Sequence, residues 1–368
     1  MNNNVKFFHS LIFAITCFVL LFSSFSCTYN EGEIFVTWVD SDGVLIDSKA
    51  VTENYDPTER KLPDDNNLWH YTGWTITQSG SVIVCTANRI EKKHVVWKDY
   101  NGGTLSEVYV AKNESLPSFD LPKSNDKWIY ESWDRNDEDN QIIFTAVRKP
   151  NVNFFVGNVF QIVVKDENGD PIGSGSGFVI NDEGWFITND HVMKDGYSAI
   201  SFFDIIDSEN GQKYTQLKII GGVYHDENRD IFIGKLEGYD KIKDHYSPIE
   251  FTEKYTIGEK SYSVGYPNSS IKLEINSGNI TEEYSDIYNK IDGIYYVLSD
   301  SYIAPGSSGG ILINESFEVV GITTTGFYSD SNKNNYISGG SVPYLLFKRN
   351  LSNLIEENIK SIPEIYKK

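Results

Sequence analysis

Tryptophan residues recur in the first half of this chain at one fixed spacing. Three of them have a counterpart 59 residues later: Trp38 and Trp97, Trp69 and Trp128, and Trp74 and Trp133. An Asp-x-Asx-Gly turn follows the first tryptophan of each stretch, and a Thr-Ala pair closes the stretches at residues 86–87 and 145–146. A constant offset across separate blocks indicates a duplicated small domain, which we expect at residues 34–89 and 95–149.

The local chemistry of each repeat favours β structure. Asn and Gly tolerate the positive φ that tight hairpins require, so the Asp-x-Asx-Gly turns predict strand–turn–strand units. Cys85 lies in an alternating apolar run at residues 82–87 and falls opposite Phe144 of the second copy. We therefore expect both side chains in the cores of small β-rich modules.

The composition is that of a folded protein with more than one domain. The chain has 368 residues, of which 40% are apolar and 14% aromatic, enough for the cores of two or three domains. A net charge of −20 repels phosphate backbones and argues against a nucleic-acid partner. The three cysteines are too few for a disulfide scaffold or a multi-cysteine zinc site, and no motif predicts a metal or another cofactor.

The N-terminus has the layout of a secretory signal peptide, expected over residues 1–27. Residues 1–10 carry the charge of Lys6, an apolar run follows at 11–22, and small residues precede Cys27. A membrane anchor is the alternative, although the run is short for a bilayer span. Residues 24–27 also resemble a bacterial lipoprotein signal, in which Cys27 becomes the lipidated first residue.

The duplicated pattern resembles the internalin-type B-repeat, a small β-grasp-like module of bacterial surface proteins. The D-x-D-G turn, the W-x-Y-x-x-W core and the closing T-A strand carry the resemblance. It implies two modules, at residues 28–91 and 92–151, that act as spacers or bind a surface ligand. The tryptophans are equally explained as core residues, and we find no catalytic constellation in this part of the chain.

The second half of the chain contains short strands separated by turns. Residues 160–164 alternate, residues 185–192 predict a strand that ends at His191, and Asp230 begins another strand. Ser308 lies in a glycine-rich loop at residues 303–312. Such a pattern, with few helical segments, indicates an antiparallel barrel or sandwich. Leucine and isoleucine at helical spacing after residue 341 predict a closing helix.

The residues around Ser308 satisfy Gly-x-Ser-x-Gly, the nucleophile elbow of α/β hydrolases. That fold places its acid and its histidine after the serine, whereas every histidine of this chain precedes Ser308. The order His191, Asp230, Ser308 instead suits a chymotrypsin-type double barrel. Asp190 and Asp226 are the rival carboxylates: a strand would aim Asp190 away from His191, and Asp226 lies in the loop before the apolar strand.

Residues from about 159 to 355 resemble a trypsin-like serine protease of the HtrA (Deg) type. GSGFVI at 175–180 and ITNDHV at 187–192 resemble the histidine motif, RDIFI at 229–233 the aspartate strand, and DSYIAPGSSGG at 300–310 the serine motif. The resemblance implies a mainly β fold, a chymotrypsin-like double β-barrel with a C-terminal helix, at residues 152–360.

The same resemblance implies roles for single residues. Ser308 would be the nucleophile, His191 the general base and acid, and Asp230 the group that orients the imidazole. The backbone N–H groups of Gly306 and Ser308 would form the oxyanion hole.

A further set of residues would bind the substrate. Tyr302 would lie near the base of the pocket for the P1 side chain, with Thr323, Thr324 and Gly326 along its wall. Because Tyr302 is not acidic, cleavage after Lys or Arg is disfavoured, and we expect a small or medium apolar P1 residue.

Two hypotheses about function follow. The first is an exported serine endopeptidase of polypeptide substrates, without cofactor or metal, held at the cell envelope by a lipid on Cys27 or else secreted or periplasmic. The second is a surface binding or adhesion protein whose protease-like domain is inactive. The complete set of His191, Asp230 and Ser308 favours the enzyme.

Overall fold

The computed structural model describes residues 33–194, 196, 198–207, 211–282, 290–291, 294–328 and 336–356. The chain divides into two compact units, one of residues 1–123 and 130–149 and one of residues 124–129 and 150–368. The expected signal peptide and Cys27 lie outside the described residues. Within the described residues, no helix has both the length and the apolar character needed to cross a membrane.

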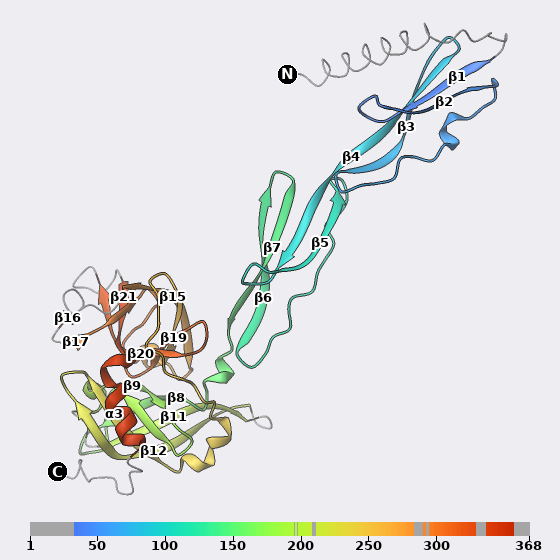
Figure 1. The fold of residues 1–368 in the computed structure, drawn as a ribbon. Helices are drawn as coiled ribbons and strands as arrows, with labels where there is room; N and C mark the ends of the chain where they lie inside the picture. Colours follow the sequence, from blue (N-terminus) through green and yellow to red (C-terminus); the bar gives the residue numbers. More distant parts are fainter. Residues whose placement is uncertain are drawn as a thin grey trace. The chain divides into compact units, whose positions relative to one another are not determined.

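The first unit is built on a seven-stranded sheet in which β4 (Val82–Lys98) runs through both repeats (Figure 1). The first half of β4 pairs in parallel with β1 (Ile34–Val39), and its second half pairs in parallel with β7 (Gln141–Pro150). The remaining strands are β2 (Leu45–Val51), β3 (Trp69–Ser79), β5 (Thr104–Ala111) and β6 (Trp128–Glu138), and a short 3-10 helix, η1 (Pro57–Glu59), follows β2. The expected border between modules, at residues 91 and 92, falls inside β4, so the two repeats share one strand.

The duplicated turns have the same backbone hydrogen bonds in both copies. Asp40 N–H donates to Val44 O at 2.9 Å, and Asp99 N–H donates to Gly103 O at 2.7 Å. Gly43 and Gly102 have φ values of +83° and +86°, a conformation that glycine adopts without steric cost. The repeated sequence motif therefore forms the same hairpin turn in both copies.

Each repeat has a small core of its own around one of the duplicated tryptophans. The buried members are Val36, Trp38, Ile83 and Cys85 in the first copy, and Val95, Trp97, Val110 and Ile142 in the second. Cys85 is fully buried as a free thiol, as its alternating strand pattern predicts. Phe144, its counterpart, is partly buried against the second core.

The second unit contains two closed six-stranded barrels, so the expected chymotrypsin-like double β-barrel is confirmed. The first barrel consists of β8 (Val159–Lys165), β9 (Pro171–Val179), β10 (Trp185–Thr188), β11 (Ser198–Asp207), β12 (Gly211–Asp226) and β13 (Ile231–Glu237). The second consists of β14 (Lys260–Gly265), β15 (Glu274–Glu282), β18 (Val297–Ser299), β19 (Ile311–Asn314), β20 (Val319–Tyr328) and β21 (Tyr336–Pro343).

Short elements connect the barrel strands. They are α2 (Asp190–Met193), the 3-10 helices η2 (Val152–Phe154), η3 (Tyr239–Lys241), η4 (Lys243–His245) and η5 (Pro267–Ser269), and the hairpin of β16 (Lys290–Ile291) and β17 (Ile294–Tyr295). The helix α3 (Tyr344–Glu356) follows β21, where the leucine and isoleucine spacing predicts a helix.

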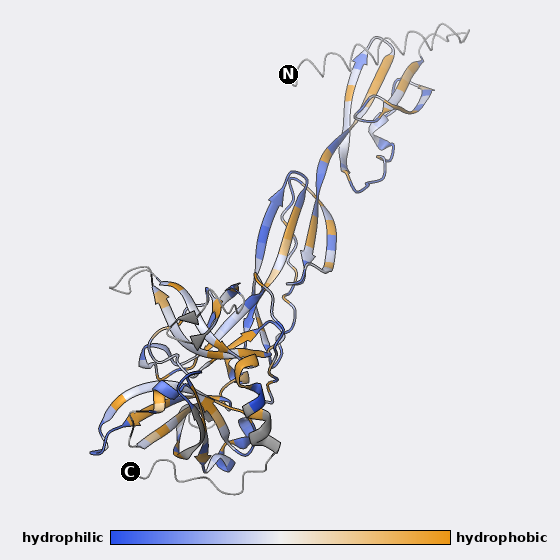
Figure 2. Ribbon diagram, turned by 60° about the vertical axis from the view of Figure 1, so that its left-hand side comes forward, coloured by the Kyte–Doolittle hydropathy of each residue, from blue (hydrophilic) through white to orange (hydrophobic). Residues whose placement is uncertain are grey.

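The strand β13 is apolar on both faces because both of its faces are buried. In β13, Ile231 and Ile233 belong to a core shared by strands of the two barrels, whereas Phe232 and Leu236 fill the interior of the first barrel. Successive residues of a strand point to opposite faces, so a strand between two cores appears in the sequence as a continuous apolar run. Hydrophobic residues accordingly mark the barrel strands in Figure 2.

Residues 124–129 belong to the second unit although they lie in sequence between strands of the first. Trp128 is 7% exposed and is part of the core that the two barrels share. Its ring centroid lies 4.9 Å from that of Phe317 and 5.8 Å from that of Tyr262.

Candidate active site

His191 lies in the short helix α2, directly after β10. The expected strand ending at His191 is wrong at this point, because the strand stops at Thr188 and Asn189 occupies the N-cap position of a helical turn. The Asn189 side chain makes no capping hydrogen bond to this turn and binds the Asp230 carbonyl instead. The argument that a strand aims Asp190 away from His191 therefore does not apply, since neighbouring helical residues are about 100° apart around the axis.

Asp230 holds His191 at two points. Its Oδ2 lies 2.7 Å from His191 Nδ1, and its Oδ1 accepts the backbone N–H of His191 at 2.9 Å. The Asp230 side chain is 7% exposed and the imidazole 43% exposed. A buried carboxylate is stabilised when both oxygens are hydrogen-bonded, so the imidazole is fixed in position while its outer edge stays accessible.

The rival carboxylate Asp226 has another partner. Its Oδ2 lies 2.5 Å from Arg229 Nη1, an ion pair three residues apart in the sequence. Asp230, the carboxylate preferred from the sequence, contacts the imidazole directly.

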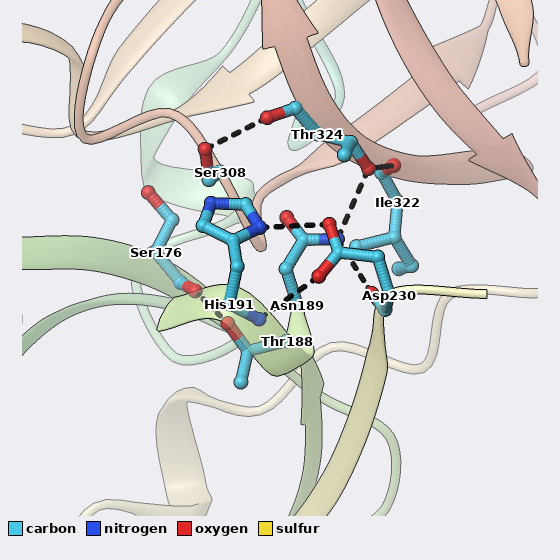
Figure 3. A network of polar contacts seen from close by, with 8 residues as sticks. All are labelled: Ser176, Thr188, Asn189, His191, Asp230, Ser308, Ile322 and Thr324. Carbon is cyan, nitrogen blue, oxygen red and sulfur yellow. Dashed lines mark hydrogen bonds and ion pairs between the residues drawn. The ribbon is translucent and has the colours of Figure 1, made fainter. Parts of the chain in front are cut away.

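Asn189 and Thr324 extend this contact into a network that links the barrels (Figure 3). Asn189 Nδ2 donates to the backbone carbonyl of Asp230 at 2.9 Å and lies 3.0 Å from Thr324 Oγ1. The Thr324 hydroxyl in turn donates to Ile322 O at 3.0 Å. The network fixes the backbone of Asp230 and joins it to β20 of the second barrel.

Ser308 enters the same network from the loop before β19. Its Oγ donates to the backbone carbonyl of Thr324 at 2.8 Å. In Figure 3 the imidazole nitrogen that does not face Asp230 is directed toward Ser308, but the described hydrogen bonds of the Ser308 hydroxyl run to Thr324. Rotation about χ1 exchanges the staggered positions of a serine hydroxyl, and such a rotation would release the Ser308 hydroxyl from Thr324 O.

The carbonyl groups of the Ser308 loop are all held by neighbouring groups. Asn268 N–H donates to Pro305 O at 2.6 Å, and Gly310 N–H donates to Ser307 O at 2.9 Å. The carbonyls of Gly306 and Ser308 are bound by Ser176, through its Oγ at 2.8 Å and its N–H at 2.6 Å.

The N–H groups of this loop divide into two sets. Ser307 N–H donates to Ala304 O, and Gly309 N–H donates to Thr323 O. Within the described part of the chain, the N–H groups of Gly306 and Ser308 have no recorded acceptor. A trans peptide directs its N–H away from its C=O, so the bonds to Pro305 O and Ser307 O turn these two N–H groups to the opposite side.

Two glycines make this loop conformation accessible. Gly306 and Gly309 have φ values of +99° and +87°. A Cβ on Gly306 would lie 2.5 Å from Tyr266 O, and one on Gly309 would lie 2.0 Å from Ser176 O. Glycine is required at both positions because φ is positive and neighbouring segments of the same backbone approach closely.

Three of the predicted substrate-binding residues lie on one strand, β20, and Tyr302 directly precedes the serine loop. Tyr302 is 44% exposed, Thr323 and Thr324 are buried in β20, and Gly326 follows them in the same strand. The Tyr302 ring centroid lies 5.2 Å from that of Tyr336 on β21. Burial raises the pKa of Tyr336 above its ordinary value, so this phenol is neutral beside Tyr302.

A cavity of about 540 Å³ opens beside the imidazole. His191, Asp230 and Thr324 line it together with Lys194, Tyr296 and Thr325. Within the described ranges, no three His, Cys, Asp or Glu side chains are grouped closely enough to hold a metal ion.

Sequence reasoning did not assign a role to three residues that shape this site. Ser176, Asn189 and Asn268 bind backbone groups of the Ser308 loop or of Asp230 across long sequence separations. For Ser176 a signal existed, because it lies between Gly175 and Gly177 in a strand, a context that marks close backbone approach.

The segment that contains this site matches a known protein family. Residues 175–322 match the family described as trypsin-like peptidase domain. This segment begins at Gly175 and includes His191, Asp230 and Ser308.

Several characterised sequences align with about half of the chain. A probable periplasmic serine endoprotease, DegP-like, of Chlamydia trachomatis serovar D is 28% identical over 185 residues, which cover 50% of this chain and 34% of the relative. Its Rhizobium meliloti counterpart is 31% identical over 193 residues, 52% of this chain and 35% of the relative. Protease Do-like 1, chloroplastic, of Arabidopsis thaliana is 28% identical over 184 residues, 47% of this chain and 37% of the relative. The chain thus spans about a third of the length of these relatives.

Solved structures give weaker similarities. An HtrA-type protease with a bound tripeptide aligns with a TM-score of 0.44 and 19% identity, over 56% of this chain and 63% of that one. The serine endoprotease from Yersinia pestis aligns with a TM-score of 0.41 and 21% identity, over 56% of this chain and 66% of that one.

Proposed function

We propose that this chain is a serine endopeptidase that cleaves polypeptides through His191, Asp230 and Ser308. The observation that carries the proposal is the pairing of a buried Asp230, hydrogen-bonded through both oxygens, with the accessible imidazole of His191. Beside it lies the serine loop, two of whose N–H groups have no acceptor among the described residues. The match of residues 175–322, which include all three side chains, to the trypsin-like peptidase domain supports it, as does the similarity to serine endoproteases.

The chemistry would proceed by acyl transfer. A serine hydroxyl is a weak nucleophile at its ordinary pKa, so Ser308 needs a base. His191 would accept the hydroxyl proton as Oγ bonds to the substrate carbonyl carbon, and would then donate it to the leaving amine. A water molecule, deprotonated by His191 in its turn, would hydrolyse the acyl-enzyme and return the hydroxyl to Ser308.

Asp230 and the loop backbone would stabilise the charges that develop. Asp230, bonded to Nδ1, keeps the imidazole proton on that nitrogen and leaves Nε2 to accept the serine proton. The N–H groups of Gly306 and Ser308 would donate to the oxyanion of the tetrahedral intermediate, where loss of one donor typically costs about 3 kcal/mol of transition-state stabilisation.

Substrate would bind as an extended chain along β20. In this proposal Tyr302, Thr323, Thr324 and Gly326 surround the P1 residue, which we expect to be small or medium-sized and apolar. Thr324 O, now bonded to Ser308 Oγ, would accept the P1 N–H, because an extended peptide adds to an exposed strand through main-chain hydrogen bonds.

We further propose that the enzyme acts outside the cytoplasm. Residues 1–27 would direct export, and Cys27 would carry the lipid anchor. Relatives described as periplasmic are consistent with export. The two repeats would then hold the protease at a distance from the envelope or bind a ligand there.

A fluorophosphonate probe tests the proposed activity. We expect the full chain to be labelled on one serine, and Ser308→Ala to be unlabelled at an unchanged melting temperature. Absence of labelling in folded wild-type protein would contradict the proposal and favour the alternative, a surface binding protein with an inactive protease-like domain.

A further inference from the structure

Ser176 connects the first barrel to the loop that carries Ser308. It lies on β9, is 0% exposed, and contacts residues that are 130 or more positions later in the sequence. Its backbone N–H donates to Ser308 O at 2.6 Å, and its Oγ donates to Gly306 O at 2.8 Å. One residue therefore binds the carbonyl groups of both residues whose N–H groups are unpaired.

The Ser176 hydroxyl is also an acceptor. Tyr266 N–H donates to it at 2.9 Å, directly before η5, and the N–H of Asn268 in η5 donates to Pro305 O. A hydroxyl offers one donor and two acceptor sites, so Ser176 links the Tyr266 backbone and Gly306 in a single bridge. The segment directly before η5 and the loop that carries Ser308 are thereby held by one buried side chain.

The space around Ser176 leaves little freedom for movement. A Cβ on Gly309 would lie 2.0 Å from Ser176 O, and one on Gly265 would lie 3.0 Å from Ser176 Oγ. Thr188 Oγ1 donates to Ser176 O at 2.6 Å and so also fixes β9 at this residue. Loss of the hydroxyl would leave Gly306 O and Tyr266 N–H buried without this partner, and buried polar groups tend to move toward new partners.

We infer that Ser176 is a positioning residue for catalysis, and that its hydroxyl, by binding Gly306 O, fixes the Gly306–Ser307 peptide that lies between the two N–H groups expected to face the developing oxyanion. The inference rests on the proposed function. Ser176 touches no reacting atom and acts only through Gly306 and Ser308. Displacement of a group in a reacting site by about 1 Å costs on the order of 100-fold in rate, so a small shift of this loop has a measurable effect.

The test compares Ser176→Ala and Ser176→Cys with Ser174→Ala in the full chain. Ser174 lies on the same strand and its hydroxyl contacts Ser269 Oγ at 3.0 Å, but it has no described bond to residues 305–309. Cysteine fills a volume close to that of serine but is a weak donor and acceptor, so it separates packing from hydrogen bonding. Melting temperatures and the inactivation constants of a fluorophosphonate probe, kinact and KI, are measured for each variant.

For Ser176→Ala and Ser176→Cys we expect kinact to fall roughly 10- to 100-fold with KI within about twofold of wild type. Ser174→Ala should keep both constants within about twofold. Binding of fluorescent casein should be equal in Ser308→Ala and in Ser308→Ala combined with Ser176→Ala, because ground-state binding does not use the oxyanion donors.

Wild-type kinact in Ser176→Cys would overturn the inference, and so would failure of that variant to fold, since either result makes Ser176 a packing residue. These outcomes differ from failure of the proposed function, in which wild-type protein itself reacts with no probe.

Discussion

Asp230 combines an unusual backbone conformation with a buried charge. Its φ is +54°, in the left-handed region that few residues other than Gly, Asn and Asp adopt readily. This conformation lets Oδ1 accept the His191 N–H while Oδ2 faces the imidazole. The strain is tolerated because Asn189 binds the Asp230 carbonyl and fixes the backbone there.

Asp230→Asn separates charge from backbone geometry, because Asn is well suited to positive φ. The amide has one acceptor oxygen for the backbone N–H and the Nδ1–H of His191, so one hydrogen bond is lost. The imidazole proton then moves from Nδ1 to Nε2, which can no longer accept the serine proton. We expect kcat on fluorescent casein to fall about 10⁴-fold with little change in melting temperature.

Asp226→Asn is the matched control for that experiment. It removes the negative charge that pairs with the Arg229 guanidinium, and its remaining amide oxygen can still accept the Arg229 backbone N–H. Activity of Asp226→Asn should stay near wild type. A larger loss in this variant than in Asp230→Asn would assign the orienting role to Asp226.

Cys85 is predicted to be unreactive in the folded protein. Burial, followed by the nearby carboxylate of Asp56, raises the pKa of its thiol from 9.0 to about 11. At pH 8 the thiolate fraction is then on the order of 100-fold lower than for an ordinary thiol, and the thiolate is the reactive form. Iodoacetamide should modify Cys85 slowly in native protein and rapidly in urea, as measured by mass spectrometry of the Cys85 peptide.

The raised pKa of Cys85 makes the free energy of unfolding depend on pH. The unfolded thiol ionises near pH 9 while the folded thiol stays protonated to about pH 11, so its contribution is complete below pH 9 and is lost as the pH rises through 11. Urea unfolding of the wild type should therefore lose more stability between pH 8.5 and 11 than that of Cys85→Ala. Parallel curves for the two proteins would show that Cys85 does not titrate differently on folding.

At the scale of elements, the turn η5 supports the serine loop through strained residues. Asn268 and Ser269 both have a φ of +56°, and two consecutive left-handed residues other than glycine are rare. Their conformation turns the Asn268 N–H toward Pro305 O. The two strained residues thus lie where the backbone reverses direction next to the loop that carries Ser308.

Substitutions of Asn268 should follow backbone preference and not side-chain size. We expect Asn268→Val to lower the free energy of unfolding by about 1–2 kcal/mol, because a β-branched residue is unfavourable at positive φ, and to lower kcat as well. Asn268→Gly should be nearly neutral in stability, since glycine accepts this conformation. Urea midpoints at constant slope provide the measurement; equal midpoints for the two variants would contradict the role given to φ.

At the scale of the whole molecule, one duplicated residue has acquired two environments. Trp69 and Trp128 occupy equivalent positions, and the residue before each accepts the same backbone bond: Lys92 N–H to Leu68 O, and Asn151 N–H to Lys127 O. Trp69 is partly buried in the first unit and contacts the Arg89 guanidinium at 3.7 Å. Trp128 instead belongs to the core of the second unit.

The two tryptophans should therefore differ in their effect on the protease unit. Trp128→Ala removes a buried indole beside Tyr262 and Phe317 and should cost about 3–5 kcal/mol in the stability of that unit. Trp69→Ala should leave it unchanged. The temperature at which fluorophosphonate labelling is lost reports on this unit alone; an equal shift in both variants would show that Trp128 has no special role there.

Several features followed from the sequence by itself. The constant spacing of the tryptophans predicted the repeats, and the glycine of each Asp-x-Asx-Gly turn predicted hairpins whose φ values are positive in the structure. Short strands separated by turns predicted an antiparallel barrel or sandwich, which the structure resolves as two closed barrels. The order of His191, Asp230 and Ser308 excluded the α/β-hydrolase arrangement. These features are local, because side-chain periodicity and turn chemistry act over a few residues.

Only the tertiary structure decided which distant groups meet. It paired Asp230 with His191 in preference to Asp226, directed the Ser308 hydroxyl to Thr324 O, and placed Ser176 against Gly306. It also changed the strand expected at His191 into a helical turn and gave Trp128 a core that Trp69 lacks. Hydrogen bonds and packing between residues far apart in the chain depend on how the two barrels close, and no short-range pattern encodes that closure.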